Sequence, residues 1–381
     1  MKRPIYFDSN ATTPVEAAVL DRMIPFFTHE YGNPSNTTHA YGWLADEAVA
    51  VAREQVAELL GASAPEIIFT SGATEAINTI IKGLARGKTS GHILTVESEH
   101  KAVLAACESL EEEGIETTYL PVDENGLITA EQVAAALRPD TFIVSVMWAN
   151  NESGVLMPIH EIAAVVANHD ALFFTDATQS IGKVEVTVDG IDLLACSAHK
   201  FYGPKGVGAI YVRSGQPVIQ IPQLLHGGAQ EKGRRASTLN VPGIVGMGVA
   251  SEMARTRQKE DHAAMSARRD RFEQIVGDAF PNVRFNGSGA ERLPQTSNAT
   301  FSGIVAAEMM GEVGRVAVSM GSACTSGSGK ASHVLTAMGI SPEDAQGTVR
   351  FSMGRHTTDE EVTEAASLLV QYAEDHESVT I

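Results

Sequence analysis

The chain has 381 residues, of which 44% are hydrophobic and 20% are charged. These proportions are ordinary for a globular protein, and the length allows two domains or one large α/β domain. Asp and Glu number 47 against 28 Lys and Arg, giving a formal net charge of −19. Such a surface repels phosphate backbones and anionic lipids, which argues against direct binding of nucleic acid or membranes.

The cysteines indicate a reducing compartment. Cys107, Cys196 and Cys324 form no CxxC pair and no even-numbered disulfide framework. The first residues turn polar before any apolar run long enough for a signal peptide. No stretch approaches the roughly 18 uninterrupted apolar residues of a membrane span. We therefore expect a cytoplasmic protein.

Between about residues 64 and 213, short apolar runs alternate with amphipathic stretches. This alternation predicts βαβ crossovers and a largely parallel sheet with helices on both faces. Strands are expected at residues 67–69, 93–96, 142–148 and 172–174. Helices are expected at residues 73–84, 101–113 and 159–167.

After Pro242 the sequence pattern changes. Residues 243–279 are rich in Ala, Met and Arg and lack turn signals, which predicts one or two connecting helices. Beyond them, the sequence predicts strands at 298–301, 316–319 and 348–352, and helices near 332–338 and 359–372. This part has the pattern of a smaller α+β domain.

Thr70 to Glu75 follow a predicted strand and open a predicted helix. Backbone N–H groups at a helix N-terminus, with hydroxyls beside them, form an anion site. An ordinary turn capped by Ser71 explains the motif equally well.

Asp176 and Lys200 both follow apolar segments, so both are expected at the carboxyl edge of the sheet, where open α/β folds bind ligands. An ionised Asp there can hold a protonated pyridine nitrogen, although a lone Asp more often caps a turn. Partial burial lowers the pKa of an amine and favours imine formation with an aldehyde. Ser197 and His199 flank Lys200 and are candidates for contacting a phosphate.

Two further polar residues are expected at this edge. His100 lies at a strand-to-helix junction, where an imidazole is either structural or stacked on a planar cofactor. Asn151 follows the apolar run that ends at Ala149. Its amide can hydrogen-bond a ring hydroxyl or form an Asx turn.

Cys324 is the one candidate nucleophile among the cysteines. It stands in the Gly- and Ser-rich segment 318–329, unlike a packed structural cysteine. Cys107, in a helical pattern, and Cys196, in a strand, have the pattern of small core residues.

Together and in this order, the motifs resemble those of cysteine desulfurases of the NifS/IscS type, within the class V, fold-type I pyridoxal-phosphate enzymes. The resemblance runs nearly end to end, from Tyr-Phe-Asp-Ser-Asn-Ala-Thr-Thr-Pro at residues 6–14 to Val-Arg-Phe-Ser-Met-Gly-Arg at 349–355. The most specific piece is Gly-Ser-Ala-Cys-Thr-Ser-Gly at residues 321–327. It separates desulfurases with a long cysteine loop from the other members of the class.

The resemblance implies an α/β fold with a large domain, residues 15–255, built on a mostly parallel seven-stranded sheet. A smaller α+β domain, residues 1–14 and 256–381, would carry the cysteine loop. Lys200 would bind pyridoxal phosphate covalently, and His100 would stack on its ring and assist proton transfer. The implied cofactor-binding residues are Ala73, Thr74, His100, Asn151, Asp176, Gln179, Ser197, His199, Lys200 and Thr238.

Thr238 would act from the neighbouring subunit, which implies a homodimer with a shared active site. Arg350, together with Asn151, would bind the carboxylate of L-cysteine, a bidentate task that suits a guanidinium. Cys324 would take the sulfur as a persulfide, release alanine and pass the sulfur to an acceptor protein. Similar enzymes serve iron–sulfur cluster assembly, tRNA thiolation and DNA phosphorothioation; no metal site is implied.

Some positions depart from the family pattern. Ala229 stands where glycine is typical, and Ala236-Ser237 replaces the common Ser-Gly. Gly-Lys-Ala-Ser at residues 329–332 stands where an acidic residue and a proline are usual.

Two alternatives remain open at this point. A class V aminotransferase or a selenocysteine lyase would share Lys200, Asp176 and His100 but would not need Cys324 in a flexible loop. A degenerate, non-catalytic interaction subunit is the second alternative, and the intact chemical positions argue against it.

Overall fold

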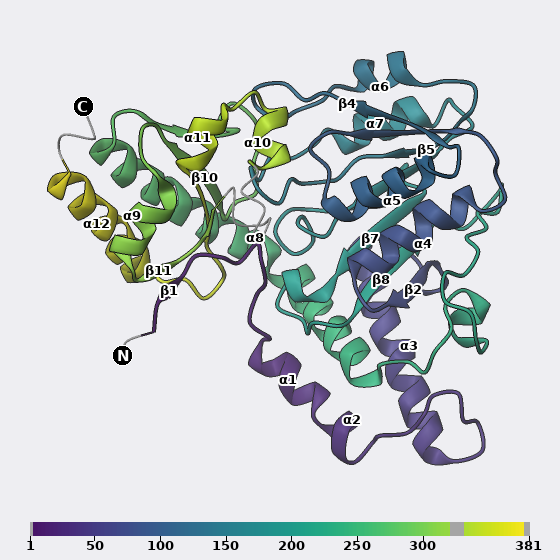
Figure 1. The fold of residues 1–381 in the computed structure, drawn as a ribbon. Helices are drawn as coiled ribbons and strands as arrows, with labels where there is room; N and C mark the ends of the chain where they lie inside the picture. The colour runs from purple at the N-terminus through teal and green to yellow at the C-terminus, as the bar shows by residue number, and fades with distance from the viewer. Residues whose placement is uncertain (1–2, 321–330, 377–381) are drawn as a thin grey trace.

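A computed structural model describes residues 3–320 and 331–376 (Figure 1). Its largest element is a seven-stranded sheet of order β2-β8-β7-β6-β5-β3-β4. Strand β8 is antiparallel to both neighbours and the other pairs are parallel, so the expected mostly parallel sheet is confirmed. The strands are β2 (Ile67–Thr70), β3 (His92–Val96), β4 (Glu116–Leu120), β5 (Thr141–Ser145), β6 (Leu172–Asp176), β7 (Leu193–Ser197) and β8 (Gly208–Val212).

Helices cover both faces of this sheet, because neighbouring residues of a buried strand point to opposite sides. Phe174 belongs to the core under α4 (Ala73–Ala85) and α5 (Lys101–Glu111). Its neighbour Phe173 belongs to the core on the other face. That face is covered by α3 (Ala40–Leu60), α6 (Ala130–Ala136), α7 (Ile159–Val166) and the first part of α8 (Val241–Ala279).

The segment expected to form one or two connecting helices is one helix, α8, of 39 residues. The side chain of Asn240 caps its start by accepting a hydrogen bond from the N–H of Gly243 at 3.2 Å. Helix α8 packs closely against α3 at Gly248, where an added Cβ would lie 2.6 Å from the Cα of Ala52. The short helices α1 (Ala17–Met23) and α2 (Pro25–Thr28) also contact α8.

A second group of elements lies at the left of Figure 1, away from the large sheet. It contains a four-stranded sheet of order β12-β13-β10-β9 and the parallel pair β1-β11. The strands are β1 (Ile5–Tyr6), β9 (Val283–Phe285), β10 (Thr296–Phe301), β11 (Val316–Ala317), β12 (Ser319–Met320) and β13 (Thr348–Ser352). The helices are α9 (Ala306–Val313), α10 (His333–Ala337), α11 (Pro342–Gln346) and α12 (Asp359–Asp375).

Two strand predictions were wrong at their bounds. The expected strand 316–319 is two strands, because Val316–Ala317 pairs with β1 and Ser319–Met320 pairs with β13. The expected strand 142–148 ends at Ser145, beyond which the backbone leaves the regular ladder. Its N–H groups still bond β6, since Val146 donates to Phe174 and Trp148 to Asp176.

We propose the two-domain division at residue 255. It is supported by a separate apolar core, built around Phe272, Phe301 and Phe351, that also takes in Phe7. The proposed boundary falls inside α8, so both cores share one helix. Within the part of the chain that the structure describes, no helix combines the length and the apolar character needed to cross a bilayer.

Candidate active site

The predicted polar residues meet where the parallel strands end. His100 follows β3, Asp176 is the last residue of β6, and Lys200 closes the short 3-10 helix Ala198–Lys200 after β7. They line a cavity of about 200 Å³. The full lining is Asn10, Ala11, Ala73, His100, Met147, Ala149, Asn151, Asp176, Thr178, Gln179, Lys200, Ser319 and Arg350.

Seven of the predicted site residues therefore share one cavity, namely Ala73, His100, Asn151, Asp176, Gln179, Lys200 and Arg350. Thr74, Ser197, His199 and Thr238 do not line it. Cys324 lies outside the described residues. Asn10, Thr178 and Ser319 line the cavity but were not singled out from the sequence.

The amine of Lys200 is held by the N-terminal segment. Its Nζ donates to the carbonyl oxygens of Asn10 at 2.6 Å and Ala11 at 2.9 Å. Thr13 fixes this segment beside the lysine, since its N–H donates to the carbonyl oxygen of His199 at 3.0 Å. The signal for this contact was present in the motif at residues 6–14.

Asp176 presents a buried carboxyl group to the same cavity. Its Oδ1 accepts a hydrogen bond from the N–H of Thr178 at 2.9 Å. Complete burial, together with the charge of Asp176, raises the pKa of the nearby Glu99 carboxyl well above its usual range. Both effects favour the protonated, neutral form of Glu99 beside the carboxylate of Asp176.

His100 caps α5 and has a defined tautomer. Its Nδ1 accepts a hydrogen bond from the N–H of Ala102 at 3.1 Å, so in the neutral ring the proton is on Nε2. Burial lowers the pKa of His100, and the positive charge of Lys200 lowers it further against the opposing effect of Asp176. His100 keeps an exposed surface, yet the surrounding protein desolvates the ring enough to favour its neutral form at pH 7.

Lys183 is a second lysine near the site that sequence reasoning missed. It is buried, and its Nζ donates to Oε1 of Gln179 at 3.0 Å. The Nε2 of Gln179 in turn donates at 2.9 Å to the Asn10 carbonyl oxygen that also binds Lys200. Burial, and then the charge of Lys200, lowers the pKa of Lys183 well below its usual range. Residues 179–183 form turns and no helix, so helical spacing gave no signal for this contact.

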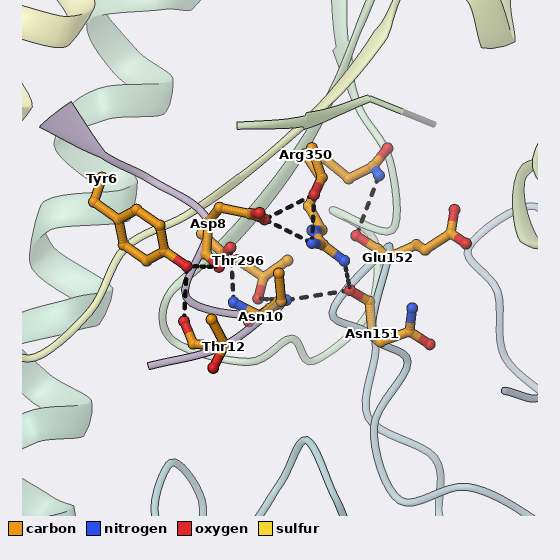
Figure 2. A network of polar contacts seen from close by, with 12 residues as sticks. Tyr6, Asp8, Asn10, Thr12, Asn151, Glu152, Thr296 and Arg350 are labelled. Atoms are coloured by element: carbon orange, nitrogen blue, oxygen red, sulfur yellow. Dashed lines mark hydrogen bonds and ion pairs between the residues drawn. The ribbon is translucent and has the colours of Figure 1, made fainter. Parts of the chain in front are cut away.

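Arg350 enters the cavity from the four-stranded sheet. On β13 it lies directly opposite Ser319 of β12 and Asn298 of β10. Its Nη1 donates to the carbonyl oxygen of Asn151 at 2.8 Å, and its Nη2 donates to Oδ1 of Asp8 at 2.7 Å (Figure 2). The site thus joins side chains from both groups of elements.

The side of the cavity nearest α4 suits an anion. The first N–H groups of this 13-residue helix have no partner within the helix. Ser197 lies beside its start, with Oγ 3.7 Å from the position that a Cβ on Gly72 would take. Burial and the neighbouring positive charges of Lys200, Lys205 and Lys183 lower the pKa of His199 to about 4.

Thr238 belongs to an exposed segment that follows a strained turn. Glu231 has φ 49° and Ser237 has φ 92°, backbone conformations that favour glycine. Arg53 holds this turn through two short hydrogen bonds to the Glu231 carboxylate, at 2.6 and 2.7 Å. Ser237 is one of the positions where the family usually has glycine.

These residues fit pyridoxal phosphate. An amine suits its aldehyde, a buried carboxylate suits its ring nitrogen, and the N-terminus of α4 suits its phosphate. Thr178 Oγ1 is buried in the cavity wall and has no partner within the described residues, so a hydroxyl remains for a bound group. An amine, a carboxylate and an imidazole at this edge of a mostly parallel sheet define a fold-type I pyridoxal-phosphate enzyme.

The chain belongs to the class-V aminotransferase family, whose profile matches residues 5–364. It is 48% identical to "Cysteine desulfurase IscS" of Anaeromyxobacter dehalogenans (strain 2CP-C), over 97% of this chain and 92% of that protein. It is 44% identical to "Cysteine desulfurase" of Homo sapiens, over 97% of this chain and 82% of that protein. The family and the cofactor that the motifs implied are thereby confirmed.

Among solved structures, the chain is similar to one titled "NIFS-LIKE PROTEIN". The TM-score is 0.90 and the identity 37%, over 97% of this chain and 98% of that one. The expected fold class, an α/β fold of the fold-type I pyridoxal-phosphate enzymes, is confirmed.

Proposed function

We propose that this protein is a pyridoxal-phosphate-dependent cysteine desulfurase that transfers sulfur from L-cysteine to Cys324. One observation carries the proposal: a single cavity joins Lys200, Asp176 and His100 of the large sheet to Arg350 of the small sheet. The named relatives are cysteine desulfurases, and a solved structure titled "SspA in complex with cysteine" is 40% identical with a TM-score of 0.82 over 93% of this chain.

The residues divide the chemistry among them. When bound, pyridoxal phosphate supplies an electron sink that allows bonds near the substrate α-carbon to break. Lys200 holds the cofactor and can take or return a proton at Nζ. Asp176 would hold a protonated ring nitrogen of the bound cofactor, and His100, which carries its proton on Nε2, would donate or accept a proton in the cavity. Arg350 orients the substrate through its carboxylate.

The sulfur step needs a thiolate. Burial raises the pKa of Cys107 and of Cys196 to about 12, so neither is ionised near neutral pH. Cys324 is the remaining cysteine. In the overall change, the carbon–sulfur bond of L-cysteine breaks and a sulfur–sulfur bond forms at Cys324. The products are L-alanine, whose β-carbon has gained a proton in place of sulfur, and a persulfide on Cys324.

The residues on either side of the segment 321–330 support this role. Ser319 lines the cavity, and Cys324 is four residues beyond Met320, at most about 14 Å of extended chain. On the other side, Ser332 donates to Oε2 of Glu152 at 2.5 Å. His333 makes a 2.8 Å hydrogen bond to the carbonyl oxygen of Glu99. One end of the segment therefore adjoins a residue that lines the cavity, and the other contacts Glu152 and Glu99, the sequence neighbours of the lining residues Asn151 and His100.

We also propose that the protein is a cytoplasmic homodimer whose two subunits share each active site. Thr238 is exposed and does not line its own cavity, which suits a threonine that completes the phosphate site of a second subunit. Exposed apolar side chains on α1 to α3, namely Leu20, Ile24, Phe27, Tyr41, Trp43 and Leu44, provide a face for a homodimer. The enzyme would act in the cytoplasm and pass its sulfur to an acceptor protein.

Two substitutions test the function. Cys324→Ser is expected to keep the visible absorption of the bound cofactor and to lower cysteine-dependent sulfide release roughly 1,000-fold, as for loss of a covalent nucleophile. Lys200→Ala is expected to lose the lysine-bound absorption band. The matched control is Cys107→Ala, which removes a buried thiol and should retain turnover. Undiminished sulfide release by Cys324→Ser would contradict the desulfurase assignment and favour a lyase of the same class, whereas an aminotransferase would release no sulfide from either protein.

A further inference from the structure

The guanidinium of Arg350 is already engaged before any ligand arrives. Its side chain is 6% exposed and forms an ion pair with Asp8 at 2.7 Å. Nη2 also donates to Oγ of Ser319 at 2.9 Å, and that hydroxyl donates to Oδ1 of Asp8 at 2.8 Å. Arg350, Asp8 and Ser319 thus form a closed triangle of hydrogen bonds, and Figure 2 labels its Arg350 and Asp8 corners.

On the Nε–Nη2 edge of the Arg350 guanidinium, only one of the two nitrogens has hydrogen-bond partners among the residues that the structure describes. Its Nε is buried and has no partner within the described residues, whereas Nη2 contacts Asp8 and Ser319. Nε and Nη2 together present the parallel N–H pair that binds a carboxylate through two hydrogen bonds. A carboxylate that uses this edge needs a hydrogen of Nη2, so it competes with the two groups already there.

The two competing groups are not held equally. Asp8 is fixed by the backbone on both sides, since Phe7 N–H donates to Ala317 at 2.9 Å and Ser9 N–H to Ser352 at 2.9 Å. Its bond to Arg350 is also charge-assisted, and such bonds are about twice as strong as neutral ones. Ser319 offers a neutral hydroxyl that can rotate about one bond. Ser319 is therefore the weaker partner of Nη2.

We propose that Asp8 and Ser319 are positioning residues for Arg350, and that a ligand carboxylate binds to Nε and Nη2 by displacing the Ser319 hydroxyl while Asp8 remains. The ligand class is the α-amino acid carboxylate, so the inference rests on the proposed function and refines its substrate site. Asp8 balances the buried positive charge when the site is free of substrate. Its negative charge also weakens carboxylate binding, because ligand and Asp8 share one cation.

The first test uses Ser319→Ala in the holoenzyme. Removing the competing hydroxyl is expected to tighten L-alanine binding about fivefold, corresponding to one neutral hydrogen bond of about 1 kcal/mol. KM for L-cysteine should fall in the same direction. The dissociation constant of L-alanine is measured by calorimetry. L-Alaninamide, which lacks a carboxylate, is the control ligand. Its affinity should be the same in wild type and variant.

The control variant is Ser302→Ala. Ser302 also donates to an aspartate, Asp344 at 3.2 Å, but does not line the cavity. It should bind L-alanine as the wild type does. Weaker or unchanged L-alanine binding by Ser319→Ala would overturn the proposal, because a merely supporting serine gives one of those two results.

The second test is Asp8→Asn, which keeps the shape and removes the charge. Without L-alanine, this variant should unfold at a lower temperature than the wild type, since a buried guanidinium has lost its counter-ion. L-Alanine should then raise its unfolding temperature more than it raises that of the wild type, because the ligand becomes the counter-ion. L-Alaninamide should not. A variant that is destabilised without this extra gain from L-alanine contradicts the proposal.

These measurements are separable from the test of the function itself. L-Alanine binding reports on Arg350 whether or not sulfur is transferred. A wild type that binds L-alanine but releases no sulfide from L-cysteine would refute the desulfurase alone. The two variants would still decide the roles of Asp8 and Ser319.

Discussion

His199 lies beside Lys200 and shares a hydrogen bond of 3.1 Å with Oγ1 of Thr12. Its pKa is lowered from 6.5 to about 4, first by burial and then by the charges of the nearby lysines. Between these two pH values the unfolded chain binds a proton that the folded chain does not. The free energy of unfolding therefore decreases as the pH falls from 6.5 towards 4.

We expect His199→Gln to reduce this acid sensitivity in the cofactor-free protein. Between pH 7 and pH 5, the unfolding temperature of the wild type should decrease more than that of the variant. Thermal unfolding at both pH values measures the difference. His29→Gln, a change at an exposed histidine, is the control and should follow the wild type. Equal losses in wild type and His199→Gln would contradict the assigned pKa.

Among single residues, the sequence predicted those site residues whose ionisable side chains follow recognisable strands. Lys200 and Asp176 stand at the ends of apolar runs and His100 stands at a strand-to-helix junction, so their place at one edge followed from the strand pattern. Lys183 and Asp8 were missed for a physical reason. Asp8 acts through Arg350, which is 342 positions away. Lys183 reaches Gln179 through the local fold of an irregular turn. Spacing along the chain does not contain such contacts.

Among the elements, α10 connects the segment after Cys324 to the large sheet. Ser332 caps α10 by accepting hydrogen bonds from the N–H groups of Val334 and Leu335, at 3.2 and 3.4 Å. The same hydroxyl donates to the buried carboxylate of Glu152. One side chain therefore both caps the start of the helix and attaches it to Glu152, the neighbour of the cavity residue Asn151.

Ser332→Ala is expected to loosen α10 by about 1–2 kcal/mol, since a cap is lost and a buried carboxylate loses its partner. Hydrogen exchange of the backbone amides of α10 should become roughly tenfold faster. Ser341→Ala removes the comparable cap of α11, where Ser341 accepts from Asp344 N–H at 3.1 Å. That control should speed exchange in α11 only. Unchanged exchange in α10 would show that the anchor is unimportant.

Helices and strands were predictable from the sequence where large apolar residues alternate clearly with polar ones. Strands β2, β3 and β6 and helices α4, α7 and α12 follow the expected segments closely. Helix α3 was not predicted. Four of its seven buried residues are Gly or Ala, so its apolar face stands out weakly from the surrounding sequence; the seven are Gly42, Ala45, Val49, Ala52, Val56, Ala57 and Leu60. Val318 separates β11 from β12, a change of pairing partner that only tertiary contacts determine.

At the scale of the whole molecule, Arg355 connects three separate parts of the chain. Its guanidinium pairs with Glu16 at 2.8 Å and with Asp261 of α8 at 2.7 Å. It also lies 4.2 Å from the ring centre of Tyr202, which follows Lys200. The Arg355 side chain is 4% exposed and that of Asp261 5%, so this is a buried ionic network.

We expect Arg355→Met to lower the free energy of unfolding by about 3–5 kcal/mol, because it leaves the buried Asp261 carboxylate without its partner. Denaturant titration measures the change. The control is Arg138→Met, which removes an exposed arginine that pairs with Glu116 and Asp140 and should change stability little. A similarly small effect at Arg355 would show that the buried network does not hold the parts together.

Helix α8 has a consequence for any attempt to divide this protein. At 1.5 Å per residue its 39 residues span about 58 Å. Ile244 and Met247 are built into one core, and Phe272 and Val276 into the other. A gene fragment that stops before α8 would leave the apolar face of α3 uncovered. One that stops within α8 would remove Phe272, which packs against Phe7 and Phe351. The two proposed domains are therefore inseparable by truncation, and the enzyme is one indivisible unit for expression and engineering.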